Sequence, residues 1–230
     1  MKESLKKQNK NETFYRILLP IIWVIFKVFF RPKVSGKEKI PKKGATVFAI
    51  NHRDTLDPII VMTSTWRPIH FLAKESLYES PFGWLFHAMA CIYVDRTAHD
   101  GAPLREAIEC LEEGKAVGVF PEGTRNRTHD LIFQDFKYGT VSMAQKTGAV
   151  VVPCVVTGKF VLFSDDLMIR FGEPMKIEPG SSLEDANRVL RERMTELWYE
   201  NLKETGRSPE QEFALRKEYK KALEKMEKRK

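Results

Sequence analysis

Short apolar runs, rich in branched and aromatic residues, recur through the middle of the chain and alternate with helix-like stretches. Polar, Gly and Pro residues bound the runs, which is typical of buried β-strands. The predicted strands are Thr46–Ile50, Ile69–Ala73, Cys91–Val94, Ala116–Phe120, Val150–Thr157 and Leu167–Phe171. The predicted helices between most of them are Pro58–Thr65, Pro81–Met89, Pro103–Glu113 and Gly139–Thr147. This alternation predicts an α/β fold built on a layered sheet.

Two further helical segments follow the last predicted strand. Glu184–Lys203 has the pattern of a helix, and Pro209–Lys230 is a charged helix with only a thin apolar stripe. The stripe consists of Leu215, Tyr219, Ala222 and Met226. Because so narrow a stripe buries little apolar surface, we expect residues 206–230 to form a charged helical tail that is mobile or loosely docked.

An apolar run near the N-terminus follows a polar, Lys-rich start. As a helix, Ile17 to Phe30 would be roughly 21 Å long, which is shorter than the roughly 30 Å hydrocarbon core of a bilayer. Lys27 interrupts the run, and Arg31-Pro32-Lys33 follows it where a signal peptide would have a small-residue cleavage site. We therefore predict that residues 1–33 form an apolar or amphipathic segment in the membrane interface. The alternative is an amphipathic helix docked on the protein's own core.

Composition indicates a globular protein, and its charge restricts the class of partner. The chain has 230 residues, of which 43% are hydrophobic and 30% charged, and this fits one domain with tails. The formal net charge of +7 implies an anionic partner: nucleic acid, acidic lipid headgroups, or a phosphorylated or acidic substrate. Cys91, Cys110 and Cys154 are too widely spaced for a zinc or disulfide motif, so we expect an intracellular, reducing location.

The segment Asn51–Asp57 follows a predicted strand and precedes a predicted helix. Such loops lie at the carboxyl end of a sheet, where α/β proteins place ligand sites. We expect Asp57 to be the N-cap of the helix, with Pro58 at its first position. The loop would then bring the carboxylate to one nitrogen of His52 and leave the other to accept a proton from a substrate hydroxyl. The alternative is a chance spacing in which Asp57 only caps its helix.

A second turn follows the predicted strand Ala116–Phe120. Its sequence is Phe120-Pro121-Glu122-Gly123-Thr124-Arg125. Gly123 permits close approach of the backbone to a ligand, and the planar guanidinium of Arg125 suits a phosphate. The alternative is an ordinary surface turn in which the Glu122–Arg125 pair is solvated.

Together, the two motifs resemble the glycerolipid acyltransferase family, which includes the 1-acyl-sn-glycerol-3-phosphate (lysophosphatidic acid) acyltransferases. The H-x4-D motif His52–Asp57 and the hexapeptide Phe120–Arg125 occur in the order and separation of that family. Cys91–Arg96 and Val151–Cys154 match two lesser blocks, and the similarity extends over roughly Val34 to Glu173. The resemblance implies a layered mixed α/β sheet with helices on both faces, similar to that of glycerol-3-phosphate acyltransferase.

The resemblance also implies roles for individual residues. His52 would be the general base, and Asp57 would stabilise the imidazolium that forms. Backbone amides near Glu122–Thr124 are candidates to stabilise the oxyanion. The substrate-binding candidates are Arg96, Glu122, Gly123, Thr124 and Arg125 from the matching motifs, Lys74, which matches less securely, and Lys137 as a further cation. No metal or redox cofactor is required, because acyl-ACP or acyl-CoA enters as a co-substrate.

One position departs from the family pattern. Asp54 stands where the family often has serine, which places a second carboxylate beside His52. If both carboxylates were ionised, the imidazole would hold its proton more tightly and lose base capacity at neutral pH. We therefore expect Asp57 to orient the ring, and Asp54 to face solvent or to pair with Arg53.

The implied activity is that of a 1-acylglycerol-3-phosphate O-acyltransferase of phospholipid biosynthesis, which converts lysophosphatidic acid to phosphatidic acid. The implied organisation is a membrane-interface segment (1–33), an acyltransferase catalytic domain (34–205) and the charged tail (206–230). The expected location is the cytoplasmic face of a membrane, with monotopic attachment favoured by the positive charge. Within this class, glycerol 3-phosphate or a lyso-aminolipid is an alternative acceptor.

Two other classes fit the sequence less well. A nucleic-acid-binding protein would suit the basic composition, but the chain has no helix-turn-helix, zinc finger or RNA-binding aromatic signature, and its lysines cluster at the tails. A lipid-directed serine hydrolase would need a nucleophile elbow, and the chain contains no G-x-S-x-G sequence.

Overall fold

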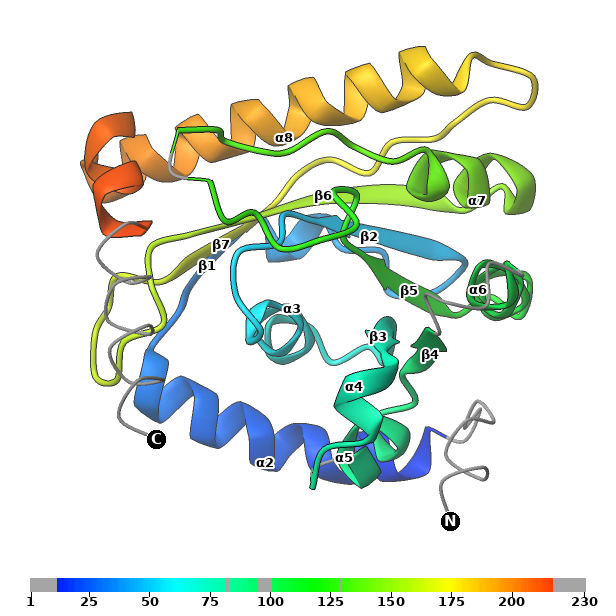
Figure 1. Cartoon of the computed structure of the whole chain (residues 1–230), viewed down its shortest axis with the longest axis horizontal. Helices are drawn as coiled ribbons and strands as arrows, with labels where there is room; N and C mark the ends of the chain where they lie inside the picture. The colour runs from blue at the N-terminus through cyan, green and yellow to red at the C-terminus, as the bar shows by residue number, and fades with distance from the viewer. Residues whose placement is uncertain (1–11, 82, 95–100, 129, 217–230) are drawn as a thin grey trace.

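The computed structural model describes residues 12–81, 83–94, 101–128 and 130–216, which form one central sheet with helices on both faces (Figure 1). The sheet has seven strands in the order β1-β7-β6-β2-β5-β3-β4. The strands are β1 (Lys33–Ser35), β2 (Thr46–Ile50), β3 (Ile69–Lys74), β4 (Ile92–Val94), β5 (Ala116–Val119), β6 (Val150–Thr157) and β7 (Met168–Phe171). The helices are α2 (Thr13–Phe30), the 3-10 helix η1 (Lys37–Lys39), α3 (Asp57–Ser64), α4 (Glu75–Tyr78), α5 (Gly83–Ala88), α6 (Ala102–Glu112), α7 (Gly139–Thr147) and α8 (Leu183–Thr205). Residues 209–216 are also helical.

The sheet is mixed, as predicted. Neighbouring strands are parallel except β6 and β7, which are antiparallel. Strand β2 lies between β6 and β5, and all five of its residues are buried, as is usual for a strand covered on both faces. Because β2, β3 and β5 run in the same direction, the loops that follow them leave from one edge of the sheet.

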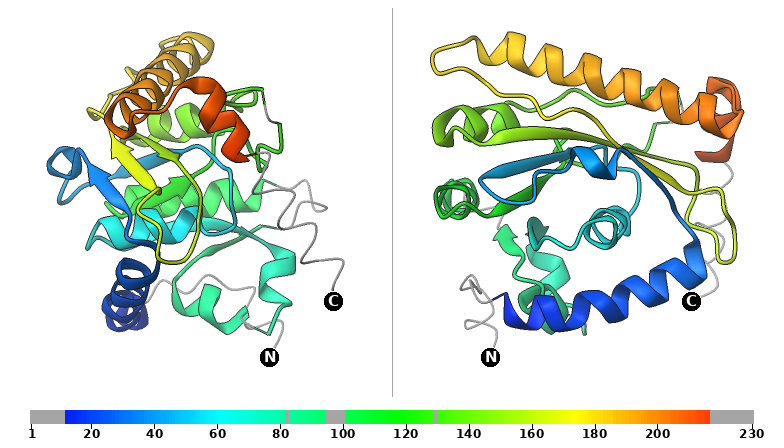
Figure 2. Two further views of the ribbon diagram at one scale, coloured as in Figure 1. Left: turned by 90° about the vertical axis from the view of Figure 1, so that its left-hand side faces the viewer. Right: turned by 180° about the vertical axis from the view of Figure 1, so that it is seen from behind.

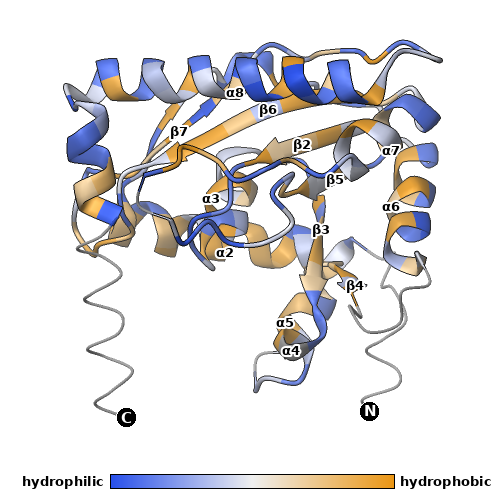
Figure 3. Ribbon diagram, turned by 45° about the horizontal axis from the view of Figure 1, so that its top comes forward, coloured by the Kyte–Doolittle hydropathy of each residue, from blue (hydrophilic) through white to orange (hydrophobic). Residues whose placement is uncertain are grey.

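Alternate residues of β2 point into two separate cores. Phe48 and Ile50 belong to the core that contains the buried residues of α2 and α3, whereas Val47 and Ala49 belong to the core formed with α6, α7 and α8. Figure 2 shows the same layers from two further sides, with α8 and α2 on opposite sides of the sheet. In Figure 3 the hydrophobic residues follow the strands, while hydrophilic residues cover the outer side of α8.

Helix α2 buries one face in the core and exposes apolar side chains on its other face. Tyr15, Leu19 and Phe26 are buried, and the Tyr15 hydroxyl accepts a hydrogen bond from the Ile69 N–H (3.2 Å). Burial raises the pKa of Tyr15 well above its ordinary value. The largely exposed apolar side chains of the helix are Phe14, Ile17, Ile21, Val24, Ile25, Val28 and Phe29. The helix is long and apolar enough to cross a membrane, judged by length and composition alone.

The docked position agrees with the alternative expected for this segment, and contact with a membrane stays a prediction. The helix docks on the protein's own core, and it also presents a continuous apolar stripe, here called the exposed stripe of α2, on the side away from the core.

Three short elements have no counterpart in the sequence prediction: β1, η1 and α4. Each has three or four residues, too few for a hydrophobic period to be recognised. The long helix α8 extends slightly beyond the predicted Glu184–Lys203. Ser182 caps its start by accepting a hydrogen bond from the Asp185 N–H (3.2 Å), and Gly206, with φ of 64°, ends it.

Candidate active site

The loops after β2 and β5 are joined to each other at the edge of the sheet. The two strands are adjacent and parallel, with Ala49 opposite Val119, so both loops start at the same level. The Asn126 N–H donates to the His52 carbonyl (2.7 Å), and the His52 N–H donates to Oε1 of Glu122 (2.8 Å). The two sequence motifs thus meet across a separation of 70 residues.

The imidazole of His52 pairs with the carboxylate of Asp57. Nδ1 lies 3.0 Å from Oδ2 of Asp57, and the ring stacks on Phe120 with centroids 3.9 Å apart and planes inclined by 19°. The His52 side chain is 19% exposed, whereas that of Asp57 is completely buried. No hydrogen bond to Nε2 comes from the part of the chain that the structure describes. With Nδ1–H donating to Asp57, the neutral ring presents the Nε2 lone pair as a proton acceptor.

The carboxylate of Asp57 is held by its own loop and does not cap the helix as predicted. The N-cap of α3 is Leu56, and Asp57 is the first helical residue. Oδ2 accepts the backbone N–H groups of Arg53 (2.6 Å) and Asp54 (2.7 Å) as well as Nδ1 of His52. The first amides of the helix are already paired, because the N–H groups of Ile59 and Ile60 donate to the Leu56 carbonyl (2.9 and 3.3 Å). Asp57 therefore orients the ring and the loop together.

Asp54 neither faces solvent nor pairs with Arg53, which corrects both expectations for it. The residue is buried, and its Oδ1 accepts the Leu56 N–H (2.9 Å), an Asx turn that shapes the same loop. The guanidinium of Arg53 instead forms an ion pair with Glu212 (2.9 Å). The carboxylate of Asp54 therefore binds a backbone N–H and not the imidazole.

Glu122 joins two loops through its carboxylate, and its expected contact with substrate stays a prediction. The residue is 2% exposed. Oε1 accepts the His52 N–H (2.8 Å) and Oε2 accepts the Gln134 N–H (2.8 Å). Burial raises the pKa of the Glu122 carboxyl, and the two N–H donors oppose that rise. Both oxygens are thus occupied by backbone groups.

The turn after Glu122 carries exposed groups next to the His52 loop. Gly123 has φ of +68°, and its N–H donates to the Phe120 carbonyl (2.9 Å), so this amide is engaged within the turn. Arg125 is exposed, and its Nη1 donates to the Thr55 hydroxyl (3.0 Å). Lys137 is also exposed, and its Cγ would lie 3.5 Å from a Cβ added at Gly123. Two cations therefore flank the turn.

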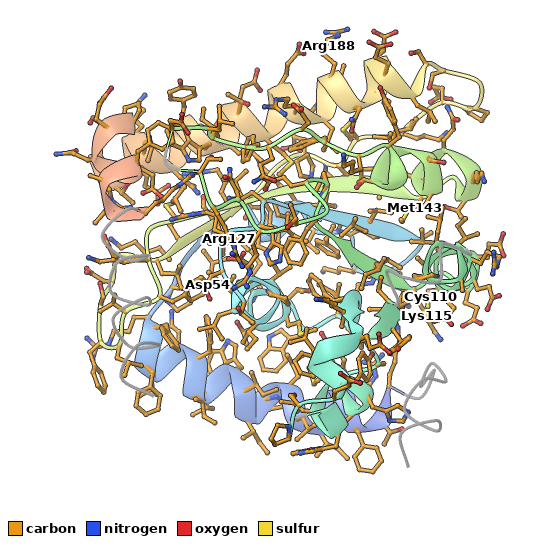
Figure 4. All side chains as sticks on the ribbon, in the orientation of Figure 1. Asp54, Cys110, Lys115, Arg127, Met143 and Arg188 are labelled. Carbon is orange, nitrogen blue, oxygen red and sulfur yellow. The ribbon has the colours of Figure 1, made fainter. Side chains whose placement is uncertain are left out.

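The remaining predicted substrate residues are placed less closely or not described. Thr124 is exposed in the turn, and Lys74 is exposed at the end of β3, on the same edge of the sheet. Arg96 lies outside the described residues. Figure 4 shows Asp54 and Arg127 near the centre of the molecule, where the loops after β2 and β5 come together.

Two residues that position the site were missed by the sequence analysis. Asn51 is completely buried and pairs with both backbone groups of Val156, donating from Nδ2 to the carbonyl (3.0 Å) and accepting the N–H on Oδ1 (2.7 Å). Its place directly before His52, at the end of a buried strand, was a signal, because a buried amide must find partners. Arg53 also holds the His52 loop in place, through its ion pair with Glu212. No local sequence pattern identifies that partner.

The three cysteines are buried and form no disulfide. Burial raises the pKa of Cys91 to about 12 and raises that of Cys154 well above its ordinary value, so both thiols stay protonated near neutral pH. Over the described ranges, no three His, Cys, Asp or Glu side chains come together as metal ligands.

The chain is similar to several known proteins. The sequence model of the family described as Acyltransferase matches residues 31–157, which is more than half of the chain and includes both motifs. A similar protein is the 1-acyl-sn-glycerol-3-phosphate acyltransferase of Borreliella burgdorferi, 36% identical over 60% of this chain and 56% of the relative. Another is the 1-acyl-sn-glycerol-3-phosphate acyltransferase of Saccharomyces cerevisiae, 32% identical over 77% of this chain and 61% of the relative. The chain thus spans little more than half the length of these relatives.

The fold is also found among solved structures. An example is the crystal structure of the 1-acyl-sn-glycerophosphate (LPA) acyltransferase, PlsC, from Thermotoga maritima, with a TM-score of 0.66. The two proteins are 24% identical, and the similarity covers 86% of each chain.

Proposed function

Because this chain belongs to the Acyltransferase family, we propose that it is a 1-acylglycerol-3-phosphate O-acyltransferase. It transfers a fatty-acyl group from acyl-ACP or acyl-CoA to the free hydroxyl of lysophosphatidic acid and releases phosphatidic acid and the thiol. The observation that carries the proposal is the 3.0 Å contact between His52 Nδ1 and Asp57 Oδ2, which leaves Nε2 as a base beside an exposed cationic turn.

In the proposed mechanism, Nε2 of His52 accepts the proton of the lipid hydroxyl while the hydroxyl oxygen attacks the thioester carbonyl. The buried carboxylate of Asp57 stabilises the imidazolium. The tetrahedral intermediate then collapses, its C–S bond breaks, and the imidazolium returns the proton to the leaving thiolate. The chain needs no serine nucleophile of its own, because the substrate supplies the oxygen.

The oxyanion of the intermediate needs hydrogen-bond donors. The Gly123 N–H already donates to Phe120, so of the amides considered in the turn we favour that of Thr124. Thr124 is exposed and lies between Gly123 and Arg125, in the turn next to the His52 loop.

The phosphate of the acceptor is proposed to bind Arg125 and Lys137. The Arg125 guanidinium is exposed and already crosses from its own turn to Thr55 of the His52 loop, so a phosphate bound there would lie near the base. Arg96 and Lys74 stay proposed contacts on the strength of the family motifs. A planar guanidinium binds a phosphate through two parallel hydrogen bonds, and an ammonium adds a point charge.

The exposed stripe of α2 is proposed to lie in the interface of a membrane, on its cytoplasmic face. If α2 instead spanned the membrane, it would leave the core and expose the apolar surface that Tyr15, Leu19 and Phe26 cover. With the helix docked, its exposed side chains can enter the acyl region while Lys27 and Arg31 reach anionic headgroups. Monotopic attachment of this kind would bring the site to a substrate that is itself a lipid.

The test is acyl transfer by the purified full chain on phosphatidylcholine and phosphatidylglycerol vesicles. Acyl-CoA and acyl-ACP would be offered separately, each with lysophosphatidic acid, glycerol 3-phosphate and lysophosphatidylethanolamine in competition, and the products measured by mass spectrometry. We expect lysophosphatidic acid to be acylated roughly tenfold faster than the others. Glycerol 3-phosphate has the same phosphate but no acyl chain to bring it to the vesicle, and lysophosphatidylethanolamine carries an ammonium group beside a singly charged phosphodiester. Preferential acylation of another acceptor would overturn the assignment of the acceptor, and absence of transfer to all three would overturn the function.

A further inference from the structure

The chain turns back sharply after α8 and returns to the active-site edge of the sheet. Gly206 takes the left-handed conformation that ends α8, and the Arg207 N–H donates to the Leu202 carbonyl (2.9 Å). Ser208 and Gln211 then cap the next helix reciprocally, with the Ser208 N–H donating to Oε1 of Gln211 (2.8 Å) and the Gln211 N–H donating to Oγ of Ser208 (3.3 Å). The direction of this short helix, drawn in orange-red in Figure 1, is therefore set by its own first residues.

Glu212 of this helix is completely buried against the His52 loop. Its Oε1 lies 2.9 Å from Nη1 of Arg53, and its Oε2 lies 2.7 Å from Nη1 of Arg207. Both oxygens also accept the Gly158 N–H, at 3.1 and 3.3 Å. Removing a carboxylate from water is costly unless it is paired and hydrogen-bonded, so these partners hold one another in place.

Arg53 connects Glu212 to the His52–Asp57 pair. Its guanidinium donates to the carbonyls of Val156 (3.3 Å) and Gly158 (2.8 Å), and its backbone N–H donates to Oδ2 of Asp57 (2.6 Å). Oδ2 is the same oxygen that faces Nδ1 of His52. A single residue thus joins the buried carboxylate of the tail to the carboxylate that orients the imidazole.

Arg216 lies on the same face of the helix, four residues after Glu212. It is buried, and its Nη1 donates to the Leu131 carbonyl (2.9 Å), which also accepts from Nδ2 of Asn126 (3.3 Å). The Asn126 N–H in turn donates to the His52 carbonyl. Burial, together with the nearby charge of Arg53, lowers the pKa of Arg216 to about 9. The described part of the tail, residues 206–216, therefore contacts the loops of both motifs. Residues 217–230, with Tyr219, Ala222 and Met226 of the predicted stripe, lie outside the described residues.

We propose that Glu212 is a positioning residue for the acyl-transfer site: by holding Arg53, it fixes the backbone amide that orients Asp57 against His52. The inference rests on the proposed function and assigns a role to a segment far beyond the region matched by the family, which ends at residue 157. Without the carboxylate, the buried guanidinium of Arg53 loses its counter-charge, and the loop relaxes to rehydrate it.

The test compares Glu212→Gln with Glu210→Gln in the full chain. The two substitutions are chemically identical and two residues apart on one helix, but Glu210 is exposed. We expect Glu212→Gln to lower kcat by roughly tenfold and to leave KM for lysophosphatidic acid within about twofold, because the base is misplaced while the phosphate contacts remain. Glu210→Gln should match the wild type in both.

A second readout separates positioning from general destabilisation. Weaker support of the imidazolium by Asp57 should move the acid limb of the pH dependence of kcat/KM, and the NMR titration of the His52 ring, to lower pH. Glu212→Asp, which keeps the charge, should recover part of the lost kcat. Equal losses in the Asp and Gln variants, or an unchanged acid limb in Glu212→Gln, would overturn the inference.

Failure of the proposed function and failure of the role of Glu212 would give different results. If the wild type transfers no acyl group to any acceptor, the proposed function fails, yet the His52 titration still decides whether Glu212 positions the ring. If Glu212→Gln does not fold, Arg53→Lys carries the test, because it keeps a cation for Glu212 and removes the fork that binds Val156 and Gly158. That variant should shift the same limb in the same direction, and an unshifted limb would contradict the proposal.

Discussion

The His52 loop, at the carboxyl ends of the strands, and helix α2, on one face of the sheet, are held by different kinds of contact. In the loop, Asp57 and Asp54 each accept backbone N–H groups of neighbouring residues, and Arg53 is fixed by an ion pair. Helix α2 is held mainly by apolar side chains on one face, and its other face is bare.

This difference determines which substitutions each region tolerates. Hydrogen bonds depend steeply on distance and angle, so the loop has one geometry, and small changes of a polar group should be felt in catalysis. Apolar contacts depend on area and packing, so α2 should respond to volume on its buried face and to hydrophobicity on its exposed stripe.

The largest effect is expected in the loop, from Asp57→Asn. The amide keeps the shape but no longer stabilises the imidazolium or selects the tautomer, so kcat should fall by roughly 10²- to 10⁴-fold. Steady-state kinetics with lysophosphatidic acid measure the effect, with near-ultraviolet circular dichroism as the check on folding. A loss below about threefold in the folded variant would show that Asp57 has no part in proton transfer.

The next effect separates the two faces of α2. Leu19→Ala removes a buried side chain and should lower the free energy of unfolding by about 2–5 kcal/mol, because it leaves a cavity. Ile21→Ala removes an exposed one and should change that free energy by less than about 0.5 kcal/mol. Urea denaturation measures both.

In a membrane-binding assay, the order of the two effects should be reversed, with the larger effect at the exposed position. Ile21→Ala should weaken binding to phosphatidylglycerol vesicles in sedimentation, while a folded Leu19→Ala protein should bind as the wild type does. If both variants bound vesicles equally well, the exposed stripe of α2 would not be a membrane-contact surface.

A smaller effect is expected at the cationic turn. Arg125→Ala should raise KM for lysophosphatidic acid by roughly tenfold, the scale of one charged hydrogen bond, and leave KM for the acyl donor nearly unchanged. Arg188→Ala is a matched control, because Arg188 is an exposed arginine on the outer side of α8, at the top of Figure 4 and away from the labelled Asp54 and Arg127. Equal increases for acceptor and donor would argue against a phosphate contact.

How far the sequence predicts the molecule also differs between these regions. The pattern predicted β2, β6 and α7 to the residue, because glycines or polar residues bound each of them. The helix expected from Ile17 ends at Phe30 as predicted but starts four residues earlier, at Thr13. Within the site, spacing and resemblance identified the His52–Asp57 pair, since both residues lie in one loop. The loop's internal geometry was not predicted, because capping statistics favour an N-cap Asp and do not include competing amides in the same turn.

Contacts between distant segments could not be predicted from one sequence. Glu122 reaches His52 across 70 residues, and Glu212 reaches Gly158 across 54. A sequence does not distinguish a buried carboxylate from an exposed one in a charged segment. Glu122 was therefore expected to contact the substrate, and Glu212 to lie in a loosely docked tail. Only the folded arrangement shows which carboxylates are removed from water.

The most direct test of the account is single-turnover acyl transfer to lysophosphatidic acid by the wild type and by His52→Ala, both bound to vesicles. We expect the rate constant to fall by roughly 10²-fold or more in the variant, the usual contribution of a positioned general base, with acceptor binding and the folded state preserved. Transfer by His52→Ala at the wild-type rate would contradict the assignment of His52 as the base and, with it, the mechanism proposed for this site.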